Sequence, residues 1–193
     1  MSETISTREQ MVATAARLFR RHGYNATSWR VLVDEAGTPW GSIQHHFPGG
    51  KEELGVEAIA YGAAQSRARF EESMDRAPNV ARGLRNWCYD LAARVQEYGW
   101  EYGCPIATVA LETVTTSPAL VRASNEAFAQ IQDALAERLR GAGLARAQAR
   151  DLATFAFSAF EGALMLARVE HSTEPLQRVG RQLEVVVVHA LDA

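Results

Sequence analysis

Hydrophobic residues recur every three or four positions along nearly the whole chain, which is the spacing of one face of an α-helix. Glycine, proline and short polar runs interrupt this pattern. The segments between the interruptions predict about nine helices, over residues 6–21, 28–36, 39–47, 51–74, 84–95, 106–113, 118–139, 152–167 and 175–190. No stretch keeps the alternation of apolar and polar positions that is typical of β-strands. The pattern therefore predicts an all-α protein.

Two of these predicted helices are short, lie near the amino end and are separated by a tight turn. Ser28 can cap the first, and Gly37 stands where a helix end favours a left-handed residue. We expect Thr38 to cap the second helix and Pro39 to lie in its first turn. Two short helices joined by a glycine-bearing turn indicate a helix-turn-helix, whose second helix enters the major groove of DNA.

Polar side chains around this second helix are candidates for DNA contacts, because arginine and glutamine can each form paired hydrogen bonds with a base edge. We expect base contacts from Arg30, Trp40, Ser42, Gln44 and His45, with Gly41 beside them. Phosphate contacts are expected from Thr27, Ser28, His46 and Lys51. Each side chain could instead be polar and exposed without touching DNA, and Trp40 could pack on the helix-turn-helix itself.

Charge along the chain is uneven. The whole chain carries a net charge of −3, but residues 17–51 hold five basic residues against two acidic ones. Three of the basic residues, Arg17, Arg20 and Arg21, lie on the polar side of the first predicted helix, either as a solvated face or as phosphate contacts. A basic amino-terminal segment on an acidic remainder is compatible with a DNA-binding protein, because phosphates respond to local charge.

From Thr27 to Leu54 the chain resembles the DNA-binding signature of the tetracycline-repressor (TetR) family. Short runs at 48–51 and 103–106 resemble the LmrA/YxaF-type branch of that family. Gln44 departs from the signature, since the family usually has a tyrosine there that often touches a phosphate. The landmarks of the signature are Gly23-Tyr24, Thr27-Ser28, Ala36-Gly37, Gly41-Ser42, His46-Phe47 and Lys51 with Leu54.

The resemblance implies a three-helix DNA-binding domain over residues 1–50 and a helical ligand-binding and dimerisation domain over 51–193. It implies a ligand-responsive repressor that binds a palindromic operator as a homodimer through its last two helices. A small effector, aromatic or lipophilic, would release the DNA. Glu161 either faces solvent or orients this ligand. The candidate pocket residues are Trp87, Leu91, Val95, Trp100, Cys104, Ile106, Phe128, Phe157, Phe160 and Glu161.

Other functional classes find less support. His45 and His46 with the nearby glutamates match no zinc spacing, and no nucleophile or phosphate loop has a recognisable setting, so we expect no enzyme, metal or cofactor. Two cysteines, no signal pattern and no apolar run of about 20 residues predict a cytoplasmic protein that does not enter a membrane. The alternative is a helical small-molecule or redox sensor, acting through Cys104, without specific DNA binding.

Overall fold

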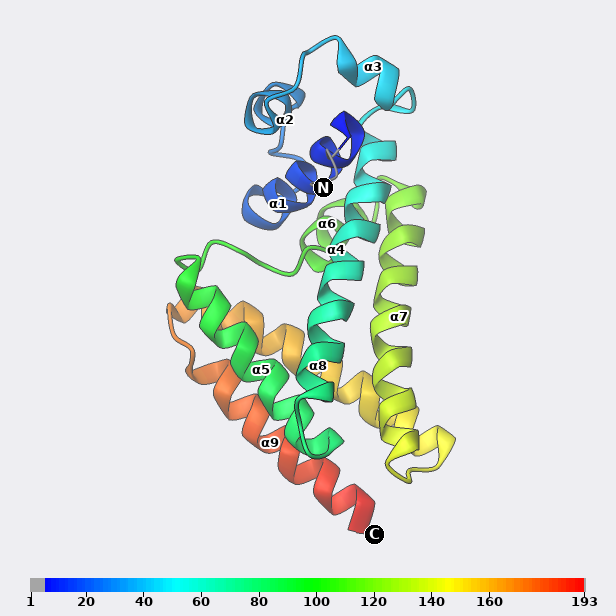
Figure 1. The fold of residues 1–193 in the computed structure, drawn as a ribbon, viewed down its shortest axis with the longest axis vertical. Coiled ribbons are helices and arrows are strands. Elements are labelled where there is room, and N and C mark those ends of the chain that lie inside the picture. The colour runs from blue at the N-terminus through cyan, green and yellow to red at the C-terminus, as the bar shows by residue number, and fades with distance from the viewer. Residues whose placement is uncertain (1–5, 193) are drawn as a thin grey trace, which may run out of the picture. The chain divides into compact units, whose positions relative to one another are not determined.

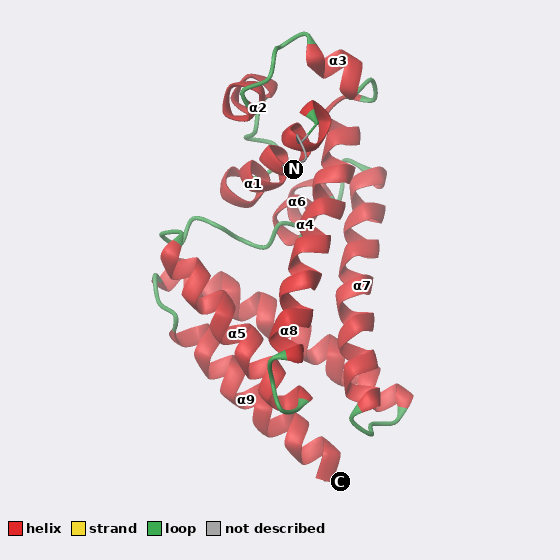
Figure 2. Cartoon of the chain, in the orientation of Figure 1, coloured by secondary structure: helices red, strands yellow, loops and turns green. Residues whose placement is uncertain are grey.

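The computed structural model describes residues 6–192, and these residues form helices and loops without any strand (Figures 1 and 2). This confirms the predicted all-α class. Most boundaries lie within two or three residues of the predicted ones. The helices are α1 (Thr7–His22), α2 (Trp29–Ala36), α3 (Ser42–His46), α4 (Gly50–Asp75), α5 (Val80–Glu97), α6 (Ala107–Thr113), α7 (Pro118–Gly141), α8 (Arg146–Glu170) and α9 (Glu174–Asp192).

The helices form two compact units. One unit holds the described residues up to 64 together with 104–128, and the other holds 65–103 together with the described residues from 129 onward. By residue number, α4 and α7 each begin in the first unit and end in the second. The predicted division at residue 50 does not coincide with a boundary between these packed units, and a functional division there stays a prediction.

The first unit is built around α1. Ser6 accepts a hydrogen bond from the backbone N–H of Glu9, and Glu9 accepts one from the backbone N–H of Ser6, so the capping box expected at this helix start is present. α1 packs against α2 and α6. The largest side chains buried in this core come from α1, α2, α4 and α7 and from the residues that follow α3 and precede α6: Met11, Leu18, Phe19, Leu32, Phe47, Leu54, Ile59, Ile106 and Leu120.

Two glycines inside α4 allow close packing in the first unit. A β-carbon at Gly55 would lie 2.7 Å from Cδ2 of Leu120, and one at Gly62 would lie 2.8 Å from Cβ of Pro105. Real β-carbons do not approach other atoms this closely, so a larger residue at either position would force the neighbouring side chain or α4 itself to move. Close approach therefore accounts for both interruptions of the helical sequence, each of which costs about 1 kcal/mol relative to alanine.

The second unit contains α5, α8 and α9, which pack on one another. Gly180 of α9 lets this helix lie close to α5, because a β-carbon there would be 2.9 Å from Cβ of Cys88. Two salt bridges from α5 to Glu184 of α9, through Arg82 at 3.0 Å and Arg85 at 2.8 Å, tie the same pair together. The result is a helical scaffold whose α8 and α9 also carry exposed apolar residues.

One helix bears on the expectation that the chain does not enter a membrane, which stays a prediction. By length and composition alone, α8 is apolar enough to cross a membrane, and it is the one such helix among the described residues. A helix that packs into the core of a soluble protein passes the same test. Buried α8 residues such as Leu152, Ala156 and Phe160 belong to the core of the second unit, which accounts for the apolar composition.

Candidate nucleic-acid interface

The first half of the helix-turn-helix forms as its sequence predicts. Ser28 is the N-cap of α2, and its hydroxyl accepts a hydrogen bond from the N–H of Val31 at 3.3 Å. Gly37 ends the helix at φ 62°, in the left-handed region that favours glycine. Leu32, Val33 and Ala36 are buried, so α2 is anchored on the core of the first unit.

The predicted start of the second helix is wrong. The N–H of Thr38 donates to the carbonyl of Val33 at 3.1 Å and so completes the end of α2. Pro39 and Trp40 then form a turn, in which the N–H of Ser42 donates to Pro39 O at 3.0 Å. α3 begins only at Ser42, with Gly41 as its N-cap and no capping side chain. The Thr38 hydroxyl, expected to cap α3, is buried without a hydrogen-bond partner among the described residues.

Most of the predicted base-contacting residues lie on the surface. Trp40 is 61% exposed, and Arg30, Gly41, Gln44 and His45 are exposed as well. Trp40 therefore does not pack into the helix-turn-helix. Ser42 is half-buried and donates its hydroxyl proton to Pro39 O at 2.6 Å, so it also holds the turn.

The predicted phosphate contacts divide into exposed and engaged side chains. Ser28 is exposed, and the half-buried His46 ring lies 4.8 Å from that of His45. Thr27 is 3% exposed and donates its hydroxyl proton to Gly23 O at 2.7 Å. This hydroxyl holds the loop before α2 together, and we do not propose that it contacts DNA.

Lys51 of α4 lies with its ammonium group 4.4 Å from the ring centroid of Tyr24. Burial lowers the pKa of Lys51, and the nearby carboxylate of Glu112 opposes that shift. Lys51 is half-buried and belongs to the first turn of α4, where free N–H groups also favour an anion. This position is compatible with the predicted phosphate contact.

Several residues that hold this unit together were not found from the sequence. Arg17 of α1 pairs with Glu35 of α2 at 2.7 Å, and this bond lowers the pKa of Glu35. Glu112 of α6 accepts a hydrogen bond from the N–H of Asn25 at 2.7 Å. Their partners lie 18 and 87 residues away in the sequence, so no local spacing indicates them.

Comparison with known proteins agrees with this geometry. A model of the tetR family of bacterial regulatory proteins matches residues 11–68, and a model of the LmrA/YxaF-like C-terminal domain of transcriptional regulators matches residues 80–182. The chain belongs to the TetR family. Like its relatives, this TetR-family protein is a DNA-binding transcriptional regulator of the repressor type and not an enzyme.

Relatives and solved structures extend the match over nearly the whole chain. This regulator is 31% identical to the HTH-type regulator YxaF of Bacillus subtilis (strain 168), over 97% of this chain and 98% of the relative. It is 29% identical to LmrA of the same organism, over 89% and 92%. A TetR regulator from Legionella pneumophila shares the fold with a TM-score of 0.83 at 22% identity, covering 95% and 98% of the two chains.

The predicted pocket residues of this TetR-family regulator fall into both units. In the second unit Trp87 stacks on Phe160, with ring centroids 3.7 Å apart and planes 8° apart, and Phe157 lies 6.5 Å from Phe160. Phe70, which the sequence did not single out, meets Trp87 edge-on at 5.2 Å. We call these four residues the aromatic cluster. Leu91 and Val95 are buried in the same unit.

The remaining pocket candidates are not members of the aromatic cluster. Trp100 is half-buried at φ 68° and stacks on His171 at 6.0 Å, while Glu161 is half-buried on α8. Cys104, Ile106 and Phe128 belong to the first unit, where Ile106 is fully buried and the other two are half-buried. The sequence pattern did not distinguish core residues from residues around a cavity.

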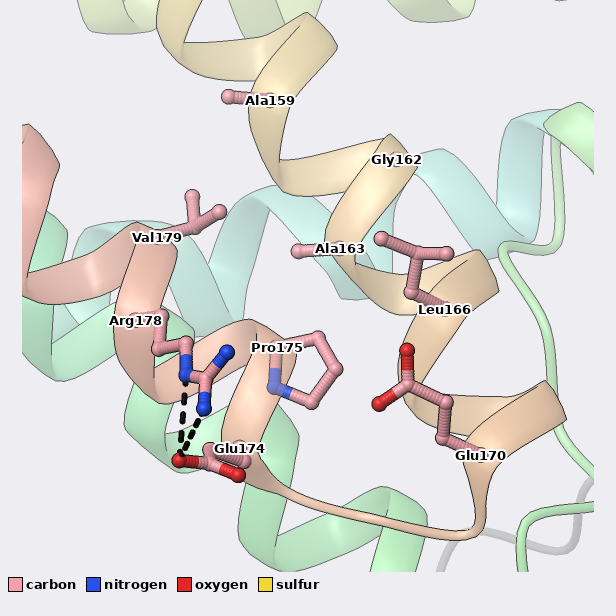
Figure 3. A pocket seen from close by; sticks show the side chains of 9 residues that line it. All are labelled: Ala159, Gly162, Ala163, Leu166, Glu170, Glu174, Pro175, Arg178 and Val179. Carbon is pink, nitrogen blue, oxygen red and sulfur yellow. Dashed lines mark hydrogen bonds and ion pairs between the residues drawn. The ribbon is translucent and has the colours of Figure 1, made fainter.

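A groove of about 380 Å³ lies between α8 and α9 (Figure 3). None of the predicted pocket residues lines it. One end is polar, where Glu174 pairs with Arg178 at 2.7 Å and Glu170 faces Pro175. The lining residues are Ala159, Gly162, Ala163, Leu166 and Glu170 from α8 and Glu174, Pro175, Arg178 and Val179 from α9.

Burial makes Cys88 chemically inert in the folded protein, because it raises the pKa of the thiol to about 12 and the thiolate is the nucleophile. We predict that Cys104→Ser, which leaves Cys88 alone, does not react with an aromatic disulfide reagent at about pH 8 unless urea unfolds it. The folded pKa exceeds the ordinary value of 9.0, so stability from this group falls as pH rises above that value. Rapid labelling of the folded variant would contradict the prediction.

Proposed function

We propose that this regulator is a cytoplasmic, ligand-responsive repressor that binds a palindromic operator as a homodimer. The observation that carries the proposal is the surface of α3 and the turn before it. Trp40, Gln44 and His45 are exposed on a helix-turn-helix whose α2 is anchored in the core. Indole, amide and imidazole groups that are exposed at such a position are available to contact a base edge, and Gln44 can form paired bonds with adenine.

Dimerisation is supported by a continuous apolar stripe on α8. The stripe runs at helical spacing through Phe155, Ala159, Gly162, Leu166 and Val169, and its large members are 54%, 47% and 78% exposed. Val185 and Val188 add exposed apolar surface on α9. The TetR-family regulators that this chain resembles bind DNA operators and dimerise. We propose α8 and α9 as the homodimer interface, with a second copy covering the groove between them.

A two-fold dimer explains why the operator would be palindromic. One α3 of five residues spans few base pairs, and a symmetric pair of helices contacts two equivalent half-sites. The combined contact area then gives a specific affinity that a single copy lacks.

The effector is proposed to bind at the aromatic cluster of the second unit. Trp87 and Phe157 each stack on Phe160, so a ligand that enters must replace ring contacts with its own. A flat aromatic or lipophilic molecule can do this. It releases the operator only if it binds the DNA-incompetent conformation more tightly than the other. Loss of the DNA complex on titration with such compounds tests this step.

We predict that Gln44→Ala and Lys51→Ala affect DNA binding differently. Loss of the Gln44 amide removes the proposed contact with one base pair in each half-site. The free energy of operator binding should therefore weaken by about 1–3 kcal/mol per half-site, with little change in binding to scrambled DNA. Loss of the Lys51 ammonium should weaken binding to all sequences and reduce the slope of log K against log salt by about 1–2 units per dimer.

Fluorescence anisotropy with the DNA upstream of the protein's own gene, and with a scrambled duplex, measures both effects at several salt concentrations. Arg140→Ala serves as a control for charge, since this exposed residue pairs only with Glu137 of its own helix in the described structure. Equal losses on both duplexes for Gln44→Ala would show that Gln44 positions the protein instead of selecting a base.

A further inference from the structure

Arg8 lies in the first turn of α1, where it contacts two other elements of the helix-turn-helix unit. Its guanidinium donates hydrogen bonds to Glu57 and, at 3.1 Å, to Glu53, and both carboxylates belong to α4. Its Cζ atom also lies 4.8 Å from the ring centroid of Phe47. Phe47 directly follows the last residue of α3. One side chain of α1 therefore joins α4 to the end of the recognition helix.

Glu53 extends this connection to the backbone between α3 and α4. Its Oε2 atom accepts a hydrogen bond from the N–H of Gly49 at 2.8 Å, while its Oε1 atom accepts from Arg8. The N–H of Gly50 donates to Phe47 O at 2.9 Å. The turn that connects α3 to α4 is thus held at Phe47 and at Gly49. Arg8 contacts the Phe47 ring directly and is linked to Gly49 through Glu53.

α3 depends on such external support. It has five residues, no capping side chain and no fully buried residue of its own. A helix this short is not stable alone, so its direction is set by the residues that flank it. Phe47 is 1% exposed and is the nearest fully buried side chain on the carboxyl side of α3. The contacts that hold the Phe47 ring in place therefore also set the direction of the exposed α3 side chains that are proposed to face DNA.

We propose that Arg8 is a positioning residue for operator recognition, which orients α3 through Phe47 and Glu53 and does not itself bind DNA. The inference rests on the operator binding proposed above. The other role open to a half-exposed arginine is a phosphate contact. Two carboxylates already accept hydrogen bonds from its guanidinium, and their negative charges offset its positive charge and weaken its attraction for a phosphate.

The decisive experiment measures binding of Arg8→Ala to operator and scrambled DNA at several salt concentrations. We expect operator affinity to fall about tenfold or more, scrambled-DNA affinity to change less than about threefold, and the salt slope to stay unchanged. Equal losses on both duplexes with a salt slope reduced by about 1–2 units per dimer would identify a phosphate contact and overturn the proposal. Unchanged binding to both duplexes would overturn it as well.

Glu57→Gln provides an independent test, since it removes a partner of Arg8 and a negative charge while Arg8 stays in place. A positioning role predicts weaker operator binding, whereas a phosphate contact predicts equal or tighter binding to every duplex. Arg8→Lys, which keeps the charge but cannot bond both carboxylates in fork geometry, should recover only part of the specificity. These two variants carry the test if Arg8→Ala does not fold. Arg140→Ala controls for charge.

Wild-type protein must prefer operator over scrambled DNA in the same experiment. If it does not, the proposed function fails. If wild type discriminates and the Arg8 and Glu57 variants discriminate equally well, only the positioning role of Arg8 fails.

Discussion

Leu166→Glu will convert the protein from a dimer to a monomer and abolish operator binding at concentrations that saturate the wild type. Leu166 is 47% exposed on the apolar stripe of α8 and lines the groove between α8 and α9. In a two-fold dimer each copy would bury one carboxylate against apolar surface without a partner, at a cost of several kcal/mol for each charge. We expect the dissociation constant of the dimer to rise at least about 100-fold.

Sedimentation equilibrium gives the dissociation constant, and anisotropy with operator DNA gives the loss of binding. Leu111→Glu is the matched control, because Leu111 is 81% exposed on α6 of the first unit, whereas α8 and α9 belong to the second unit. The control should stay dimeric and bind DNA. If Leu166→Glu remains a dimer with wild-type affinity, α8 does not form the interface in the way we propose.

Phe160→Ala will lower the free energy of unfolding by about 3–5 kcal/mol, the typical cost of removing a buried aromatic ring. Phe160 is 6% exposed and stacks on Trp87 at 3.7 Å, and its ring centroid lies 6.5 Å from that of Phe157. The substitution removes a stacked pair and leaves a cavity that the surrounding helices cannot close completely. Urea unfolding followed by circular dichroism, at one fixed protein concentration, measures the loss.

Phe160→Leu is the control for cavity size, since it retains most of the buried volume and should cost clearly less. A loss below about 1 kcal/mol for Phe160→Ala would show that the ring is not part of a tightly packed core. The alanine variant also tests the effector proposal. An aromatic compound that fills the new cavity should restore part of the lost stability by binding only the folded state.

The helix-turn-helix shows where local sequence was sufficient and where it was not. Ser28 and Gly37 act within a few residues of themselves, and the expected cap and left-handed turn are present. Thr38 and Pro39 also have the right composition to open a helix, but the N–H of Thr38 bonds to Val33 at the end of α2. Thr38 and Pro39 could either open a new helix or complete the end of α2. Packing of α2 on the core favoured the second arrangement, which the composition did not indicate.

The candidate pocket shows a different limit. Trp87, Phe157 and Phe160 were predicted to line a pocket, and they are buried. The same helical spacing marks a residue that fills a core and a residue that lines a cavity, because both face away from water. The groove between α8 and α9 was therefore not predicted, since it depends on two helices that meet only in the folded chain.

The sequence by itself determined the helices, the capped α2, the basic amino-terminal segment and the resemblance to the TetR family, because each depends on residues a few positions apart. Only the tertiary structure decided how α3 is held. Arg8 and Glu57 lie 49 residues apart, and Asn25 and Glu112 lie 87 apart. Hydrophobic periodicity indicates the helix face on which a side chain lies, but not the residue that the side chain contacts. Those contacts form only when the helices pack, and they depend on close approaches such as those at Gly55 and Gly62.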